Sequence, residues 1–436
     1  MLRAANRHQR NRNQSTLTQP KISNQPGPVD LQHRDLQHRD QQNSRLILQS
    51  SLLATICCLL FALAPFVSHA ESELTIGYIG WKKDPRYSKS HVRKRLPLQP
   101  GGRPDAGAQL AINDSKFALL ESGTTLSLQK KLLRKPEQLE ETLQSYLDEG
   151  IEHVLLDLPV DMVVRAADLA NGKSVLLYNI SAFDDALRSR CDANLLHTIP
   201  SHRMLADALT QFLLDRKWKN LLVLKGTQPI DQAWNESFLA SAKRLGLRLR
   251  DTRDFVPGTD PRNRSKNNIA LLTKGKYDVV VVLDAMAEFA ALVPYQTQNA
   301  RPVVGSAGLV PVAWHWSWER HGAPQLQNRF RKLAERDMSS IDWAAWVAVK
   351  SLVQTIQRVG NSDFNQVNDF LRGDKLEVDT FKGASSSYRS WNGQLRQNLL
   401  LTDGRWVVER APLTGFLHKT ENMDTLGLSE QESTCK

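Results

Sequence analysis

Short apolar runs that alternate with amphipathic stretches are the feature that most constrains the fold of this chain. The runs at 153–158, 174–180, 220–226 and 277–285 each have an apolar centre, as strands do when helices cover both faces of a parallel sheet. Between them, apolar residues recur at three- and four-residue intervals, the spacing of helices with one buried face. Strands and helices in this order form right-handed βαβ units. We therefore predict an α/β fold with parallel sheets.

The alternating pattern occurs twice, which predicts two lobes. The second series follows an extended run at 194–199, Pro200, and Ser201, which is suited to cap the N-terminus of a helix. In this interpretation the extended run carries the chain from the first sheet to the second. The predicted division is 71–194 and 319–385 for lobe one, and 195–318 and 386–436 for lobe two with a C-terminal segment.

The last part of the chain is predicted to complete these lobes and not to form a third. The run 312–318 alternates as an extended strand does, and 286–296 and 341–360 have helical spacing. Residues 399–412 predict a β-hairpin with Asp403 and Gly404 at its turn.

Residues 1–70 are predicted to be a disordered leader followed by a signal peptide. The first part is rich in Gln, Asn and Arg and lacks apolar periodicity. Arg45 precedes the apolar run 52–64, and Ser68 and Ala70 supply small residues before a cleavage site. The alternative is a retained membrane anchor, although the run is short for a span of about 20 residues. Cleavage after Ala70 predicts export to the periplasm.

Two cysteines lie beyond this leader, Cys191 and Cys435. In an oxidising compartment an even pair favours a disulfide, which would restrain the C-terminal tail. The alternative is a pair of free thiols.

Composition and motifs argue against several functional classes. The formal net charge is +11, yet no basic run is interleaved with aromatic residues, so nucleic-acid binding is not expected. The sequence contains no Gly-x-Ser-x-Gly turn, phosphate-binding loop or His/Cys cluster at metal-binding spacing. We expect no enzyme activity, no cofactor and no metal.

The order of these stretches resembles the type I periplasmic binding proteins, the branched-chain amino acid binding family of ABC transporters. The resemblance covers residues 74–412 and is carried by "LTIGYIG", "GAQLAINDSK", "NLLHTIPSHRMLADAL", "FLASAKRLGLRL", "YDVVVVLD" and "WAAWVAVKSLVQTI". The closing run "YRSWNGQLRQNLLLTDGRWVVERAP", with "GFLH" and "DTLG", is similar to a subgroup found with pyrroloquinoline-quinone-dependent alcohol oxidation systems. The resemblance implies two Rossmann-like, doubly wound lobes, joined by crossing strands, that close on a ligand by a hinge motion.

The function implied by this resemblance is that of an exported solute-binding protein. Such a protein would act as a monomer, bind a small molecule between its lobes and deliver it to an ABC permease in the inner membrane. The subgroup implies a link to alcohol catabolism. An alternative is a periplasmic accessory or sensor protein of an alcohol-oxidation system that acts through protein contacts. An oxidoreductase subunit is a third possibility.

The implied ligand site lies at the carboxyl ends of the strands, where loops and helix N-termini converge. Each candidate has an alternative role. Trp81 could pack only on its own loop, Asp231 could cap the following helix, and Asp284 could be paired inside the protein. The candidate ligand-binding residues are Trp81, Asp157, Asn179, Ser181, Thr227, Gln228, Asp231, Asp284 and Ser306.

Two departures from the family pattern concern specificity. Amino acid binders place small hydroxyl residues in the loop after the third strand, whereas this chain has "LDLPVD" at 156–161. The Tyr-Gly element expected in lobe two is replaced by "PIDQAW" at 229–234. We therefore expect leucine, isoleucine and valine to bind weakly or not at all.

We predict processing after Ala70. Mass spectrometry of the exported protein should find Glu71 at the N-terminus, because the small residues at 68 and 70 fit the signal peptidase site. An intact leader, or another N-terminus, would contradict the assignment.

Overall fold

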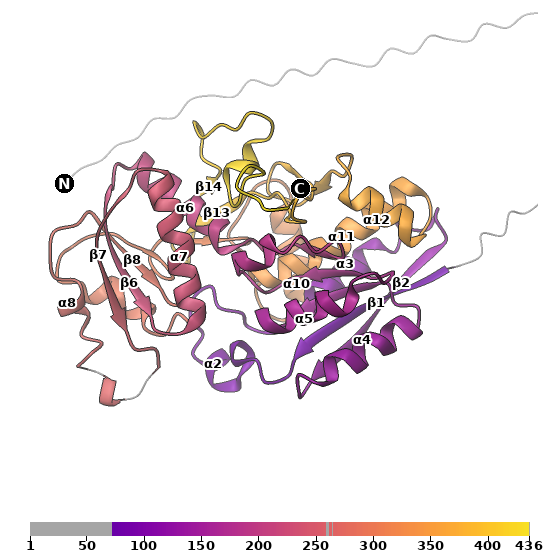
Figure 1. Ribbon diagram of the computed structural model, residues 1–436, viewed down its shortest axis with the longest axis horizontal. Coiled ribbons are helices and arrows are strands. Elements are labelled where there is room, and N and C mark those ends of the chain that lie inside the picture. The colour runs from indigo at the N-terminus through magenta and orange to yellow at the C-terminus, as the bar shows by residue number, and fades with distance from the viewer. Residues whose placement is uncertain (1–71, 259–260, 264, 436) are drawn as a thin grey trace, which may run out of the picture. The chain divides into compact units, whose positions relative to one another are not determined.

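The computed structural model describes residues 72–258, 261–263 and 265–435 (Figure 1). The predicted leader, signal peptide and cleavage site lie outside these residues. No helix in the described part of the chain is long and apolar enough to cross a membrane.

Lobe one is built on a five-stranded sheet in which all neighbouring strands are parallel, in the order β2-β1-β3-β4-β5. Helices α4 (Gln138–Asp148) and α5 (Val160–Ala170) supply one apolar cluster of this lobe, and α3 (Asp105–Ser115) and α11 (Ser340–Val359) supply another. Every residue of β3 and β4 is buried, as predicted for strands covered on both faces. The strands are β1 (Ser72–Trp81), β2 (Thr124–Leu133), β3 (His153–Asp157), β4 (Leu176–Asn179) and β5 (Leu195–His197).

The packing of α11 joins a distant part of the sequence to lobe one. Helix α3 approaches α11 so closely that a Cβ atom on Gly107 would lie 2.0 Å from the carbonyl oxygen of Asp342. Only glycine permits this approach. Helices α10 (Ala323–Ala334) and α12 (Phe364–Arg372) contribute to the same apolar cluster.

Lobe two is built on a four-stranded parallel sheet in the order β7-β6-β8-β9. Helices α6 (His202–Asp215) and α7 (Pro229–Arg244) pack with β6 and β8 in one apolar cluster. The short helices α8 (Ile269–Leu272) and α9 (Val293–Gln296) belong to another. The strands are β6 (Asn220–Gly226), β7 (Arg248–Phe255), β8 (Val279–Leu283) and β9 (Val303–Gly305).

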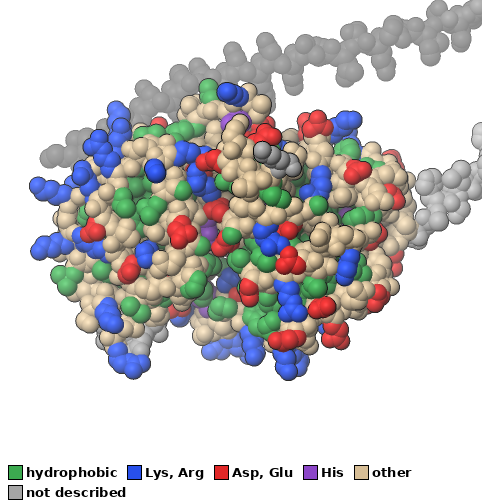
Figure 2. All heavy atoms as spheres, in the orientation of Figure 1, with side chains coloured by type: hydrophobic (Ala, Val, Ile, Leu, Met, Phe, Trp, Pro, Cys, Tyr) green, Lys and Arg blue, Asp and Glu red, His purple; other side chains and the backbone are tan. Residues whose placement is uncertain are grey.

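The edge strand β7 is largely exposed and carries alternating basic and acidic side chains. Figure 2 shows Lys and Arg side chains at this outer edge of lobe two. Charged side chains on an edge strand oppose pairing with another chain.

A three-stranded antiparallel sheet accompanies the crossings between the lobes. It consists of β10 (Val310–Val312), β13 (Leu399–Thr402) and β14 (Val407–Ala411). The last two strands form the predicted hairpin, with Asp403 and Gly404 in the connection. The two parallel sheets and their helices confirm the predicted α/β class.

Three local predictions are corrected. The run at 194–199 does not simply cross to lobe two, because Leu195–His197 pairs with β4 in the first sheet, so the crossing begins at Thr198. The run 312–318 is not a continuous strand, since Trp314 and Trp318 are buried while Trp316 is 41% exposed. The helix predicted at 286–296 is reduced to a short turn and α9, because its first residues wrap around the carboxylate of Asp284.

The crossing segments are held by a buried polar cluster. Arg188 donates hydrogen bonds to the carbonyl oxygens of Ala182, Asp184 and Ile199, at 2.8–2.9 Å, and to Oε1 of Gln394 at 2.9 Å. Gln394 in turn donates to the carbonyl oxygens of His197 and Ile199 at 3.1 Å. Burial lowers the pKa of Arg188 to about 10, so the side chain remains charged at neutral pH.

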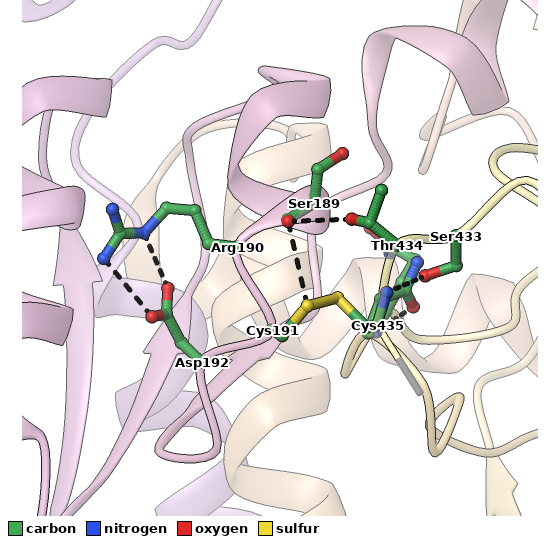
Figure 3. Close-up of a disulfide and its surroundings, with 9 residues drawn as sticks. Ser189, Arg190, Cys191, Asp192, Ser433, Thr434 and Cys435 are labelled. Atoms are coloured by element: carbon green, nitrogen blue, oxygen red, sulfur yellow. Dashed lines mark hydrogen bonds and ion pairs between the residues drawn. A yellow bond between two sulfur atoms is a disulfide. The ribbon is translucent and has the colours of Figure 1, made fainter.

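The C-terminal segment 412–435 lies against lobe two and is joined covalently to lobe one. Asp207 on α6 accepts a hydrogen bond from the backbone N–H of Gly427 at 2.7 Å. At its end, Cys435 forms a disulfide with Cys191, 244 residues earlier in the chain, with the Cα atoms 5.1 Å apart (Figure 3). The hydroxyl of Thr434 donates to the carbonyl oxygen of Ser189 beside it.

We predict that replacing both Cys191 and Cys435 with Ser lowers the free energy of unfolding by about 2–4 kcal/mol, because the disulfide restricts a long loop in the unfolded chain. Thermal unfolding with and without reductant measures the effect. Reductant should lower the Tm of the native protein and leave that of the double variant unchanged. Free thiols in non-reducing peptide maps would contradict this prediction.

Candidate functional site

A cavity of about 540 Å³ lies between the two parallel sheets. Its lobe-one wall consists of loops that follow β1, β3 and β4, and its lobe-two wall of loops that follow β6, β8 and β9. Strand β10 and the N-terminus of α11 complete the lining. The carboxyl ends of both sheets therefore face the same space, as in ligand sites of open α/β folds.

The structure places five of the nine candidate residues on the cavity wall. These are Trp81, Ser181, Gln228, Asp284 and Ser306. The other four do not line it. Asp157, Asn179 and Asp231 are buried behind the wall, and Thr227 is exposed outside it.

Asp157 is a structural hub beneath the lobe-one wall. Its carboxylate accepts hydrogen bonds from the hydroxyls of Tyr78 and Tyr87 at 2.7 and 2.9 Å. It also forms ion pairs with Arg86 at 3.1 Å and Arg103 at 3.3 Å. These four donors occupy a carboxylate that is fully buried, so its role is to hold the wall together.

Asn179 shapes the next loop of lobe one. Its amide nitrogen donates to the carbonyl oxygen of Ala182 at 2.8 Å, and its oxygen accepts from the backbone N–H of the same residue at 2.9 Å. The side chain also lies 3.1 Å from Nδ1 of His197. Asn179 therefore positions Ser181, which does line the cavity, and does not itself face it.

Two acidic residues organise the lobe-two wall. The carboxylate of Asp284 accepts hydrogen bonds from the backbone N–H groups of Met286, Phe289 and Ala290 at 2.9–3.2 Å. Asp231 accepts one from Ala285 at 2.9 Å. Burial, together with the charge of Asp284, raises the pKa of Asp231 to about 6. Both carboxylates serve loop structure: Asp284 is paired inside the protein, as the alternative from the sequence has it, whereas Asp231 bonds to the loop after β8 and does not act as the N-cap of α7.

A long loop after β1, residues 82–104, covers one side of the cavity; we call it the lid. The lid contributes Asp84, Arg86 and the stretch 97–100 to the lining. Lys94 reaches lobe two and forms an ion pair with Glu288 at 2.5 Å. The length of the lid and its prolines distinguish it from an ordinary βα connection.

Three aromatic rings form a stack on the cavity wall where the chain enters lobe two. The His202 ring lies between Phe183 and Trp234, with ring centroids 5.8 and 5.6 Å apart and interplanar angles of 14° and 11°. Burial lowers the pKa of His202 to about 4, so the imidazole is neutral at physiological pH. Phe183 precedes the crossing and Trp234 lies on α7, so the contact depends on the tertiary fold.

Within the described residues, no group of three or more His, Cys, Asp or Glu side chains could hold a metal ion.

Comparisons with known proteins agree with this architecture. Residues 134–405, more than half of the chain, match the family described as Periplasmic binding protein. The chain belongs to this family, and its fold is that of the type I members. No curated protein matches the sequence.

Solved structures with the same fold include three from bacterial transport systems. A branched-chain amino acid ABC transporter ligand-binding protein of Burkholderia xenovorans is 12% identical, with 77% of this chain and 95% of that chain covered and a TM-score of 0.61. A leucine-, isoleucine-, valine-, threonine- and alanine-binding protein of Brucella ovis is 13% identical, with 76% and 89% covered and a TM-score of 0.62.

The third is a solute-binding protein of an ABC transporter from Rhodopseudomonas palustris, solved with 3,4-dihydroxybenzoic acid. It is 12% identical, with 76% of this chain and 92% of that chain covered and a TM-score of 0.59. At these identities the likeness concerns the fold.

We predict that Asp231→Asn stabilises the protein at pH 7.5 by about 1–2 kcal/mol. The pKa of Asp231 is raised to about 6 in the folded protein. Ionisation of Asp231 therefore lowers the free energy of unfolding as the pH rises from about 4 to 6, and the loss stays constant at higher pH. The amide retains an oxygen for the Ala285 N–H. Urea unfolding at several pH values tests this: the gain should disappear near pH 4.

The control is Asp148→Asn at an exposed position of α4. If the gain in the free energy of unfolding from Asp231→Asn is the same at pH 4 and pH 7.5, the charge of Asp231 has no effect on stability and the prediction is wrong.

Proposed function

We propose that this protein is the exported solute-binding component of an ABC transporter and binds a small molecule in the interlobe cavity. The observation that carries the proposal is the cavity itself, about 540 Å³, with walls from both lobes. Its volume is within the range of about 300–1,000 Å³ for small-molecule sites. A ligand that contacts both walls would stabilise the closed arrangement of the lobes.

Membership of the periplasmic binding protein family supports the transport role, with an inner-membrane permease as the partner and the periplasm as the location. The solved relatives support a small organic ligand, since one was determined with 3,4-dihydroxybenzoic acid and another is described as binding leucine and related amino acids. The protein is proposed to act as a monomer without a cofactor.

The resemblance of the closing run at 388–412 to the alcohol-oxidation subgroup supports a ligand from alcohol catabolism. This link would place the protein beside pyrroloquinoline-quinone-dependent alcohol oxidation in the periplasm. In the alternative role, an accessory or sensor protein of that system, protein contacts would replace ligand binding.

The test is a thermal-shift screen of the purified exported protein against alcohols, aldehydes, carboxylates and amino acids. A ligand at 100 times its Kd should add about 2.7 kcal/mol to the free energy of unfolding. Ala285→Trp, at a position on the cavity wall, should abolish the response. Ala186→Trp, at an exposed position outside the lining, is the matched control.

A protein whose Tm is unchanged by every compound would contradict small-molecule binding and favour the accessory role. A response that survives Ala285→Trp would place the ligand elsewhere.

A further inference from the structure

The charged side chains on the cavity wall are mostly acidic. Among the described lining residues, the charged ones are three acids, Asp84, Asp184 and Asp284, and one arginine, Arg86. His202 adds no positive charge, because burial keeps its imidazole neutral near pH 7. The wall therefore presents more negative than positive charge to a ligand.

The one arginine is already neutralised within the protein. The guanidinium of Arg86 pairs with Asp84 at 2.6 Å and with Asp157 at 3.1 Å, and it donates to the carbonyl oxygen of Ser181 at 3.3 Å. Its side chain is 21% exposed. An arginine held by two carboxylates has little capacity left for the carboxylate of a ligand, since a new anion would also approach Asp84.

Several backbone N–H groups of the loop that follows β8 are likewise occupied. Those of Met286, Phe289 and Ala290 donate to Asp284, and that of Asp284 donates to the hydroxyl of Ser306 at 2.8 Å. A ligand carboxylate placed against this loop would meet the Asp284 carboxylate, whose neighbouring N–H donors are already used.

Most of the remaining lining residues are apolar, and several of them carry flat rings. Trp81 lies on the lobe-one wall, and the stack of Phe183, His202 and Trp234 lies where the chain enters lobe two. Leu158 and Val312 are among the aliphatic residues between them in the lining. Ligand binding to such walls is favoured by the burial of apolar ligand surface and by packing of a ligand ring against the aromatic side chains.

Resting on the proposed function, we propose that the cavity selects an uncharged ligand with a flat, apolar body and excludes carboxylates and zwitterionic amino acids. The selection arises from the wall's excess of acidic groups and from the pairing of Arg86 with Asp84 and Asp157. An aromatic alcohol has this chemistry, because it combines a flat ring with a neutral hydroxyl that Ser306 or Gln228 on the wall could meet.

The experiment compares ligands of similar size that differ in charge. Calorimetry at pH 7.5 measures the Kd of benzyl alcohol, benzoate, benzylamine and leucine with the full exported protein. We expect benzyl alcohol to bind at least tenfold more tightly than each of the other three. Benzoate, benzylamine or leucine binding as tightly as benzyl alcohol would overturn this inference and leave the proposed solute-binding function standing.

A variant tests the cause of the selectivity. Asp184→Asn removes one negative charge from the wall. In the native protein Asp184 accepts a hydrogen bond from the backbone N–H of Ala186 at 2.9 Å, and the asparagine side chain keeps an oxygen for this bond. The preference for benzyl alcohol over benzoate should fall at least threefold. Asp168→Asn, which removes an exposed acid paired with Arg190 outside the lining, should leave the preference unchanged.

Asp84→Asn is a second variant. It removes one of the two carboxylates that pair with Arg86, so it should also reduce the preference for benzyl alcohol over benzoate. Circular dichroism checks that each variant is folded. An unchanged preference in both folded variants would overturn the electrostatic explanation. If none of these four compounds binds but another compound in the screen raises the Tm, the proposed ligand class is wrong and the solute-binding function stands. If no compound in the screen raises the Tm, the proposed solute-binding function is itself contradicted.

Discussion

The buried guanidinium of Arg188 holds together the segments through which the chain passes between its lobes. Its four hydrogen bonds end on three backbone carbonyls and on Gln394, from parts of the sequence more than 200 residues apart. Loss of the side chain would remove four hydrogen bonds from buried backbone and side-chain acceptors, which is costly in the interior of the protein. Because these crossings are fixed, the carboxyl ends of both sheets are directed at one cavity.

The base of that cavity shows how internal charge pairing can set the character of a site. Asp157 and Asp84 are matched by Arg86 and Arg103, and two tyrosine hydroxyls add to the same cluster. Burial and the neighbouring carboxylate raise the pKa of Tyr78, so its hydroxyl stays protonated and donates a hydrogen bond to Asp157. The protein's own side chains thus occupy donors that could otherwise hold an ionic ligand.

The sequence was most informative where local pattern and burial agree. Runs such as the one at 279–283 predict buried parallel strands, and Ser201 does cap α6 by accepting the N–H of Met204. Asp157 and Asn179 were correctly placed at strand ends, but periodicity does not reveal that long-range partners turn both inward. The stack around His202 depends on residues brought together only by the tertiary fold.

The lid is attached at both ends to one carboxylate. Arg86 near its start and Arg103 near its end both pair with Asp157, so the loop is closed at its base and much of the entropy of ordering its ends is already lost. It should therefore travel with lobe one as a rigid rim. The lid reaches lobe two at Glu288, which pairs with Lys94 and lies 3.7 Å from Nδ1 of His91, so any movement of lobe two away from the lid has to break these contacts.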